Sequence, residues 1–370
     1  MLTLTENRGR TVLMVAAENG REDAMHLLLN HPSADPAAMA MATEPRGFTA
    51  LMLAAENSHV DAMRSLLNTQ SANPAAMLLH ASSDGSTALI VAAEKDCMVA
   101  LRCLLYHLSA NPEAMMKHSN SRGLTALMAA AQEGHVDAMR LLIHRPFADA
   151  AGMMLLVEHR GFTAFMLAAV NGHVGAMRLL LDYPFAVPAS MLMHTNSDGL
   201  TTLMVAAENG QLGAMRLLLN HPAAHPAAML AMRTPEDCMI TSALMAAAGF
   251  AAGQPTITSL APTRSCAPLL LLLNHAAVEQ LPSEAQQAHM NAVMVALREG
   301  PLSQDIFDDG QADDVRDACI RLLLERGACA VRAASPLVAR IIGENMQLAL
   351  VSDAFVDVAT KSQKRPRHNA

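Results

Sequence analysis

Glycine recurs in this chain at an interval that limits the kind of fold the chain can adopt. Six glycines follow one another at steps of 38 residues: Gly9, Gly47, Gly85, Gly123, Gly161 and Gly199. A threonine stands two residues after each glycine: Thr11, Thr49, Thr87, Thr125, Thr163 and Thr201. A fixed period of this order is the signature of a repeat architecture, in which each unit buries its apolar surface only by stacking on its neighbours. The chain is therefore predicted to be a stack of similar units.

Each unit is predicted to contain two helices followed by a third, shorter one. The threonine hydroxyl suits the position before a helix, and the paired alanines that follow, such as Ala54-Ala55, let two helices approach closely. A glycine after this block, such as Gly134, suits the left-handed residue that ends a helix. A second block, residues 136–143, carries apolar side chains at helical spacing. Asp or Asn before Pro, as in Asn73-Pro74, predicts the short helix.

A few positions depart from this unit. Ser58 and Asp96 stand where other repeats have the helix-ending glycine, and Ala150 replaces the proline of the short helix. Val187 and His225 replace its capping Asp or Asn, so the short helices of the fifth and sixth repeats are expected to be held less firmly. The fold class predicted is all-α, a solenoid of stacked helix-turn-helix units with an extra short helix in each repeat.

The fifth unit carries a resemblance to a known family. It reads Gly161-Phe162-Thr163-Ala164-Phe165-Met166-Leu167-Ala168-Ala169, then Gly172-His173-Val174, then Leu179-Leu180-Leu181. This resembles the ankyrin repeat, whose unit runs G-x-T-P-L-H-x-A-A, then G-H, then a helix that ends in L-L. Two departures are present: T-A-L-M replaces T-P-L-H in most units, and the period is 38 residues instead of 33. The extra residues fall where the family has a projecting β-finger, and the short helix is expected there.

The resemblance continues less regularly toward the C-terminus. Residues 241–248 open a seventh unit, and residues 318–324 form the second helix of an eighth. The predicted division is six regular ankyrin repeats over residues 1–232, degenerate repeats with insertions and a C-terminal cap over residues 233–351, and a tail over residues 352–370.

Composition narrows the choice of partners. Hydrophobic residues make up 52% of the chain, with 28 Met and no Trp, so a large aliphatic core is expected. The net charge of −8 is opposite in sign to that of a typical nucleic-acid binder. No apolar run is long enough for a transmembrane helix, no secretory signal is recognisable, and six scattered cysteines fit reduced thiols. These features predict a cytoplasmic protein without cofactor, membrane, nucleic-acid or small-molecule ligand, with delivery to a host cell or to the nucleus as alternatives.

Three side-chain patterns have a competing functional interpretation. His59, His135 and His173 recur once per repeat, but neighbouring repeats lie about 10 Å apart, too far for one metal ion to bridge. The acidic segment at residues 305–314 lacks the ligand spacing of an EF-hand, which favours a solvated loop. Methionines of the first helix, such as Met52, are interpreted as core, whereas those of the short helix, such as Met77, are either core or an adaptable binding surface.

No catalytic triad, phosphate-binding loop or metalloprotease motif is visible, so the predicted function is a non-catalytic scaffold that binds another protein. The alternatives are a bacterial or viral ankyrin effector that acts on host proteins, and the regulatory subunit of an enzyme complex. The resemblance implies that contacts come from residues beside the glycine and after the alanine pair, on a long concave surface. These residues are Arg46, Phe48, Glu56, Leu124, Arg160, Phe162, Val170, Leu200 and Glu208. The apolar ones beside the glycines, Phe48, Leu124, Phe162 and Leu200, are expected to be exposed.

Both ends of the chain carry predictions of their own. Lys364, Arg365 and Arg367 resemble a short nuclear-import signal, against the interpretation of a solvated chain end. At the other end, ten residues precede Thr11, and the first repeat carries Leu13, Val15, Met25 and Leu28 at positions that elsewhere pack on both sides. We expect residues 1–46 to fray or to pair with another segment, which faster hydrogen exchange there than in repeats three to six would reveal.

Overall fold

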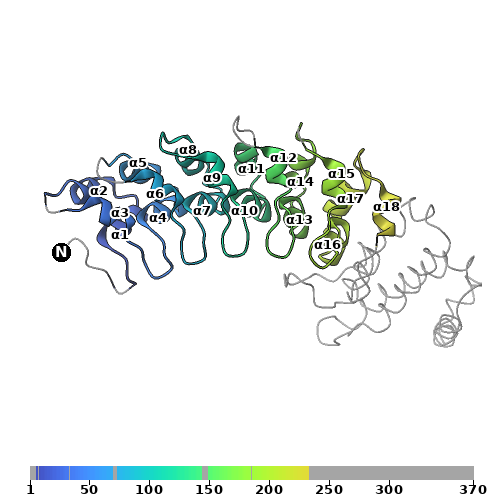
Figure 1. Cartoon of the computed structure of the whole chain (residues 1–370), viewed down its shortest axis with the longest axis horizontal. Coiled ribbons are helices and arrows are strands. Elements are labelled where there is room, and N and C mark those ends of the chain that lie inside the picture. The colour runs from blue at the N-terminus through green and yellow to red at the C-terminus, as the bar shows by residue number, and fades with distance from the viewer. Residues whose placement is uncertain are drawn as a thin grey trace, which may run out of the picture.

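The computed structural model describes residues 6, 8–32, 34–69, 73–143, 149–184 and 186–232. Within these residues the chain forms a stack of helical units, and each unit contributes an inner, an outer and a short helix (Figure 1). Helices are accompanied there only by three isolated β-bridges, so the predicted all-α solenoid is confirmed. The degenerate repeats and the tail lie outside the described residues, and the domain division stays a prediction.

The helices follow one another in the same order in all six units. The inner helices are α1 (Val12–Glu18), α4 (Ala50–Glu56), α7 (Ala88–Glu94), α10 (Ala126–Glu133), α13 (Ala164–Val170) and α16 (Thr202–Glu208). The outer helices are α2 (Glu22–Leu29), α5 (Val60–Leu67), α8 (Met98–Tyr106), α11 (Val136–Ile143), α14 (Val174–Leu181) and α17 (Leu212–Asn220). The short helices are α3 (Pro36–Met41), α6 (Pro74–Leu79), α9 (Pro112–Lys117), α12 (Ala150–Met154), α15 (Pro188–Met193) and α18 (Pro226–Ala231).

Threonine begins the inner helices, as its spacing predicts. The hydroxyls of Thr11, Thr49, Thr125, Thr163 and Thr201 each accept a hydrogen bond from the backbone N–H three residues on, at 3.3–3.4 Å. Thr87 is the exception, because its buried hydroxyl has no hydrogen-bond partner among the described residues. Inner helices of seven or eight residues are too short to persist alone, so packing supplies most of their stability.

The turn between inner and outer helix needs a left-handed residue. Gly134 has φ +77° there, where glycine carries no steric penalty. Ser58 and Asp96 occupy the equivalent place with φ of +60° and +54°, a conformation that costs a side-chain-bearing residue about 1–2 kcal/mol. The second and third repeats therefore keep the common turn at some cost in stability.

The short helices follow the predicted caps closely. Asp35, Asn73, Asn111 and Asp149 accept hydrogen bonds from the backbone N–H three residues on, at 2.9–3.2 Å. Val187 and His225 provide no side-chain cap for α15 and α18. One methionine at the equivalent position of each short helix is at most 4% exposed, and the open question about these six is decided in favour of the core: Met39, Met77, Met115, Met153, Met191 and Met229.

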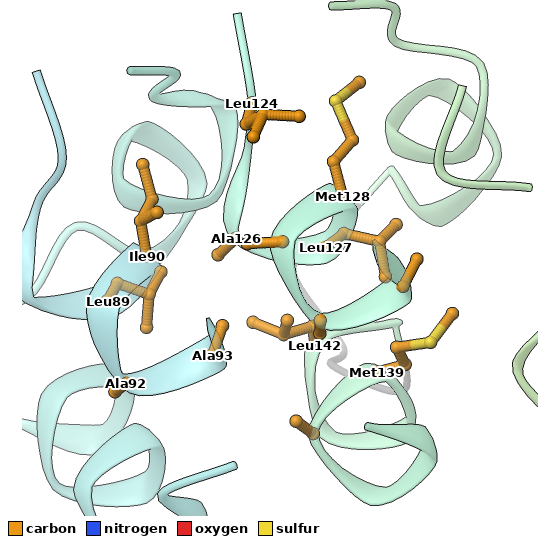
Figure 2. Packing of buried hydrophobic residues seen from close by; sticks show 14 of the residues in the cluster. Leu89, Ile90, Ala92, Ala93, Leu124, Ala126, Leu127, Met128, Met139 and Leu142 are labelled. Carbon is orange, nitrogen blue, oxygen red and sulfur yellow. The ribbon is translucent and has the colours of Figure 1, made fainter. Parts of the chain in front are cut away.

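The core runs without interruption between the inner and outer helices. Figure 2 shows α7 beside α10, with the small side chain of Ala93 on the side of α7 that faces the next repeat. The inner-helix methionines are fully buried, as predicted: Met14, Met52, Met128, Met166 and Met204. Burying a side chain such as Met128 or Leu142 stabilises the fold by about 1.5–3 kcal/mol. Because each unit shares this core with its neighbours, no unit has a core of its own.

A tight hairpin precedes each inner helix, and we call it a finger and number it by its repeat. In finger 2 the backbone N–H of Glu44 donates to the carbonyl of Phe48 at 3.1 Å, and that of Gly47 donates to the carbonyl of Glu44 at 2.7 Å. The family's finger is thus retained in addition to the short helix, which holds the extra residues of the 38-residue period. The short helix lies between the outer helix and the next glycine, as predicted, and the finger follows it.

Consecutive fingers are joined by backbone hydrogen bonds. The N–H of Ser83 donates to the carbonyl of Arg46 at 2.8 Å, and the N–H of Ser197 donates to that of Arg160 at 2.9 Å. Equivalent bonds of 2.7 and 3.1 Å join finger 3 to finger 4 and finger 4 to finger 5. Pro45 occupies this place in finger 2 and has no N–H to donate, so fingers 1 and 2 lack this connection.

The first repeat differs from the prediction in which apolar residues it exposes. Leu13 and Met25 are fully buried, because the second repeat and their own helix pair cover them, and Val15 and Leu28 are half-buried. Val12 and Leu27 are exposed instead, at 49% and 76%. Fraying of residues 1–46 stays a prediction.

Candidate protein-binding surface

The residue before each finger glycine lies exposed at the tip of the hairpin. From finger 1 to finger 6 these tip residues are Arg8, Arg46, Asp84, Arg122, Arg160 and Asp198. Because the fingers project from one edge of the inner helices (Figure 1), the tips form a row along the stack. Two basic tips are followed by an acidic one, twice in succession. We call this row, with the adjoining exposed ends of the inner helices, the finger side.

Fingers 2 and 5 share one local arrangement. The guanidinium of Arg46 lies 4.4 Å from the ring centroid of Phe48, and that of Arg160 lies 5.3 Å from the ring centroid of Phe162. The arginine side chains are 59% and 49% exposed. Both stacks are within the range of favourable cation–π contacts. Arginine is therefore presented to solvent by an aromatic ring that restricts its motion.

A glutamate fixes the backbone of each of these two fingers. Glu44 Oε1 accepts hydrogen bonds from the backbone N–H and from Nε of Arg46, at 3.2 and 3.1 Å. Glu158 Oε1 accepts from the backbone N–H groups of Arg160 and Phe162, at 2.9 and 3.1 Å. These bonds hold the turn in one conformation, so little ordering is left to be done when a partner binds.

Fingers 3 and 6, which follow fingers 2 and 5 in the stack, each carry an aspartate at the tip. Asp198 Oδ2 lies 3.8 Å from Nη2 of Arg160. Burial by itself would raise the pKa of Asp84, but hydrogen bonds from the Ser82 hydroxyl and from the backbone N–H and hydroxyl of Ser86 outweigh it and lower that pKa. Asp84 is consequently a charged, fixed acceptor at neutral pH.

The structure corrects the exposure expected for several of the predicted contact residues. Leu124, Phe162, Val170 and Leu200 are between 0% and 4% exposed and belong to the apolar core, and Phe48 is half-buried against it. The reason is that stacked repeats cover the base of each finger, where apolar side chains gain by leaving water. Glu208 is also buried, whereas Arg46 and Arg160 are exposed and Glu56 is half-buried. Arg46 and Arg160 can therefore meet a partner directly, and the half-buried Glu56 and Phe48 can do so in part.

Sequence reasoning passed over the other finger tips. Arg122 and the two aspartates, Asp84 and Asp198, stand directly before the repeated glycine, so the 38-residue period already marked their position. Nη2 of Arg122 donates to Oε1 of Gln132 at 3.2 Å, a contact that directs it along the inner helix α10. The sequence signal that could have identified them is the change of charge from one repeat to the next at the position before the glycine.

Among the three histidines that recur beside the turn, His135 contacts the backbone of the preceding repeat. Nε2 of His135 lies 2.9 Å from the carbonyl oxygen of Glu94, at the end of the preceding inner helix. His118 and His194 contact the finger carbonyls of Gly85 and Gly161 at 2.9 and 3.0 Å. Across the described residues no group of three His, Cys, Asp or Glu side chains could hold a metal ion. These histidines connect turns to backbone.

The remaining site predictions concern cysteines, membrane spans and the C-terminal tail. Cys97 is buried and Cys103 half-buried, and both are free thiols. None of the helices described here is long and apolar enough to cross a membrane. Lys364, Arg365 and Arg367, together with the acidic segment at residues 305–314, lie outside the described residues.

Comparison with known families agrees with the architecture. The family described as ankyrin repeats in three copies matches residues 2–77, 72–153, 92–189 and 147–229. These matches together span residues 2–229, more than half of the chain, and the chain belongs to the ankyrin-repeat family. No curated protein matches the chain significantly. Ankyrin repeats are generally protein–protein interaction modules and typically non-catalytic.

Proposed function

We propose that this protein is a non-catalytic scaffold that binds another protein through its finger side. The observation that carries the proposal is the pair of arginines, Arg46 and Arg160, each stacked on a phenylalanine ring and exposed to solvent. Arginine and aromatic residues dominate the binding energy of protein interfaces when they are held in place. An exposed arginine contributes much less than this to the stability of the fold, because ion pairs at the surface are weak.

The alternation of charge indicates what the partner surface carries. Carboxylates opposite Arg46 and Arg160 and basic groups opposite Asp84 and Asp198 would complement the row of tips. Such complementarity acts mainly on association rate and on the choice of partner. The proposed ligand is therefore a folded protein surface of mixed charge, longer than a single repeat.

An effector that acts on host proteins and a regulatory subunit would use the same surface. They differ in the origin of the partner and in whether the partner is permanently bound. Free thiols at Cys97 and Cys103 support a reducing compartment, and we place the interaction in the cytoplasm. Co-purification of the intact chain from its native cells separates an obligate subunit from a transient binder.

The test compares proteins captured by the intact chain and by two charge-reversed variants. Arg46→Glu/Arg160→Glu changes the finger side, and Arg178→Glu/Arg216→Glu makes the same charge change on exposed positions of the outer helices α14 and α17. Partners that use the finger side are expected to be lost from the first variant and kept by the second. Because the first variant places a carboxylate beside Glu44 and Asp198, its unfolding midpoint is measured first, and Arg46→Gln/Arg160→Gln replaces it if the midpoint falls. Loss from both variants, or from neither, contradicts the proposal.

A further inference from the structure

The sequence of the third repeat differs from the sequences of the other five regular repeats at three positions of its outer helix and the turn after it. Val99, Tyr106 and Leu108 stand there. The residues equivalent to Val99 are Asp23, Asp61, Asp137, Gly175 and Gly213; those equivalent to Tyr106 are Asn30, Asn68, His144, Asp182 and Asn220; those equivalent to Leu108 are Pro32, Gln70, Pro146, Pro184 and Pro222. One repeat has thus replaced polar or turn-forming residues with apolar ones at three places.

These three side chains contribute little to the core. Val99 is 56% exposed, Tyr106 63% and Leu108 102%. Single exposed apolar residues are common on protein surfaces and need no explanation. Three such residues in one repeat, at positions that are polar or turn-forming in its neighbours, are different, because grouped exposed apolar side chains mark interaction sites.

The helical register brings Val99 and Tyr106 to one face of α8 with an arginine, and Leu108 stands in the turn that follows the helix. Val99, Arg102 and Tyr106 are spaced i, i+3 and i+7 on α8, and they lie along one side of that helix. The span from Val99 to Tyr106 is about 10 Å at 1.5 Å per residue, and Leu108 follows two residues after Tyr106. We call Val99, Arg102, Tyr106 and Leu108 the α8 patch. Its helix belongs to the outer row, away from the fingers (Figure 1).

Val99 also stands where the second repeat has an aspartate that pairs with the arginine of its outer helix. In α5, Asp61 Oδ1 lies 3.6 Å from Nη1 of Arg64, three residues further along the helix. In α8 the position of that aspartate is Val99, and exposed Arg102 makes no ion pair with any described residue. Arg64 and Arg140 occupy the equivalent positions of the two adjoining repeats, so the arginine at the centre of the patch lies between two more.

We propose that the α8 patch is a second docking surface, which takes an acidic and apolar segment of a partner protein. The carboxylate of that segment pairs with Arg102, and its apolar side chains cover Val99, Tyr106 and Leu108. Pairing of two copies of this chain with the centre of the patch on the two-fold axis is disfavoured, because Arg102 of one copy would then face Arg102 of the other. With four side chains the surface is small, and it suits a transient contact made in addition to the finger side.

The experiment selects ligands for the intact chain from a displayed library of helical peptides. Counter-selection uses Val99→Asp/Tyr106→Asn/Leu108→Gln, which gives the third repeat the side chains of the second at these positions: Asp61, Asn68 and Gln70. Because the second repeat folds with those residues, the variant is expected to keep its unfolding midpoint. Peptides that prefer the natural chain are expected to carry Asp or Glu between apolar residues and to bind the variant roughly tenfold or more weakly.

A charge reversal then tests the proposed ion pair between Arg102 and a carboxylate of the peptide. Arg102→Glu is expected to abolish binding of the selected peptides, and Arg216→Glu, at the equivalent position three repeats away, is expected to leave it unchanged. The proposal is overturned if no peptide distinguishes the natural chain from the triple variant. It is also overturned if the preferred peptides lack a carboxylate, or if the triple variant loses stability, since the apolar residues would then serve the fold.

Discussion

The inner and outer helices of this stack divide stability and variation between them. Inner helices α4, α7, α10 and α13 pack against their neighbours on both sides, and their alanine pairs have no exposed surface. Outer helices bury one stripe and expose the rest, as in α8, where Val99 and Tyr106 reach solvent. A residue enclosed on all sides is constrained by volume, whereas an exposed one is nearly free to change. Partner-specific differences between repeats can therefore collect on the outer helices and at the finger tips.

The largest expected contrast lies between two aromatic side chains. Phe165, in the inner helix α13, is fully buried, and Phe165→Ala is expected to cost about 3–5 kcal/mol because it leaves a cavity. Tyr106, at the end of the outer helix α8, is 63% exposed, and Tyr106→Ala is expected to cost less than about 1 kcal/mol. Urea unfolding followed by circular dichroism measures both. Similar losses for the two variants would contradict the division between inner and outer helices.

The next contrast separates the core role of the finger phenylalanines from their role beneath arginine. Phe162 is 2% exposed, so Phe162→Ala is expected to cost about 3 kcal/mol and to confound any binding assay. Leucine occupies this place in fingers 4 and 6, as Leu124 and Leu200. Phe162→Leu is therefore expected to cost no more than about 1.5 kcal/mol while removing the ring under Arg160.

The effect of the finger phenylalanines on binding is then measured with a partner protein captured through the finger side. Phe162→Leu and Phe48→Ala are both expected to weaken binding with helicity retained, since each leaves its arginine without a stacked ring. The matched control is Leu124→Met, a conservative change at the equivalent buried place of finger 4. Unchanged affinity of Phe162→Leu, measured by titration calorimetry, would show that the stacked ring does not matter.

The features that could be predicted from the sequence are those set by local residue type, and the features that could not are those set by the stacking of repeats. The period of Gly161 and its equivalents fixed the number and kind of helices, because backbone conformation and capping depend on local residue type. Exposure of Leu124 and Leu200 was predicted wrongly, since whether a turn residue faces solvent or the next repeat depends on stacking geometry and not on spacing along the chain. The stack of Arg46 on Phe48 was equally out of reach, because adjacency in sequence does not determine which way two side chains turn.

A smaller contrast tests the caps of the inner helices. The hydroxyl of Thr163 accepts a hydrogen bond from the backbone N–H of Met166 at 3.3 Å, and Thr163→Val is expected to cost about 1 kcal/mol. Thr87 is buried with its hydroxyl unpartnered among the described residues. Thr87→Val keeps the shape and removes a polar group that gains nothing, so it is expected to be neutral or to stabilise by up to about 1 kcal/mol. Thermal unfolding measures the stability of the two variants. An equal loss of stability in Thr87→Val and Thr163→Val would contradict the difference in capping.

The smallest expected effect comes from moving the α8 patch to a neighbouring outer helix. Asp61→Val/Asn68→Tyr/Gln70→Leu gives the second repeat the side chains of Val99, Tyr106 and Leu108 around Arg64. The Asp61–Arg64 pair is more than 60% exposed on both sides, and its loss is expected to cost only about 0.5 kcal/mol. Because the outer face tolerates such changes, the variant should fold with an unchanged circular dichroism spectrum. Peptides selected on the α8 patch should then bind at two places, which calorimetric titration reports as a doubled stoichiometry. If the variant unfolds at the temperature of the natural chain but still binds one peptide, these four side chains are not sufficient to form a docking surface, which contradicts the prediction.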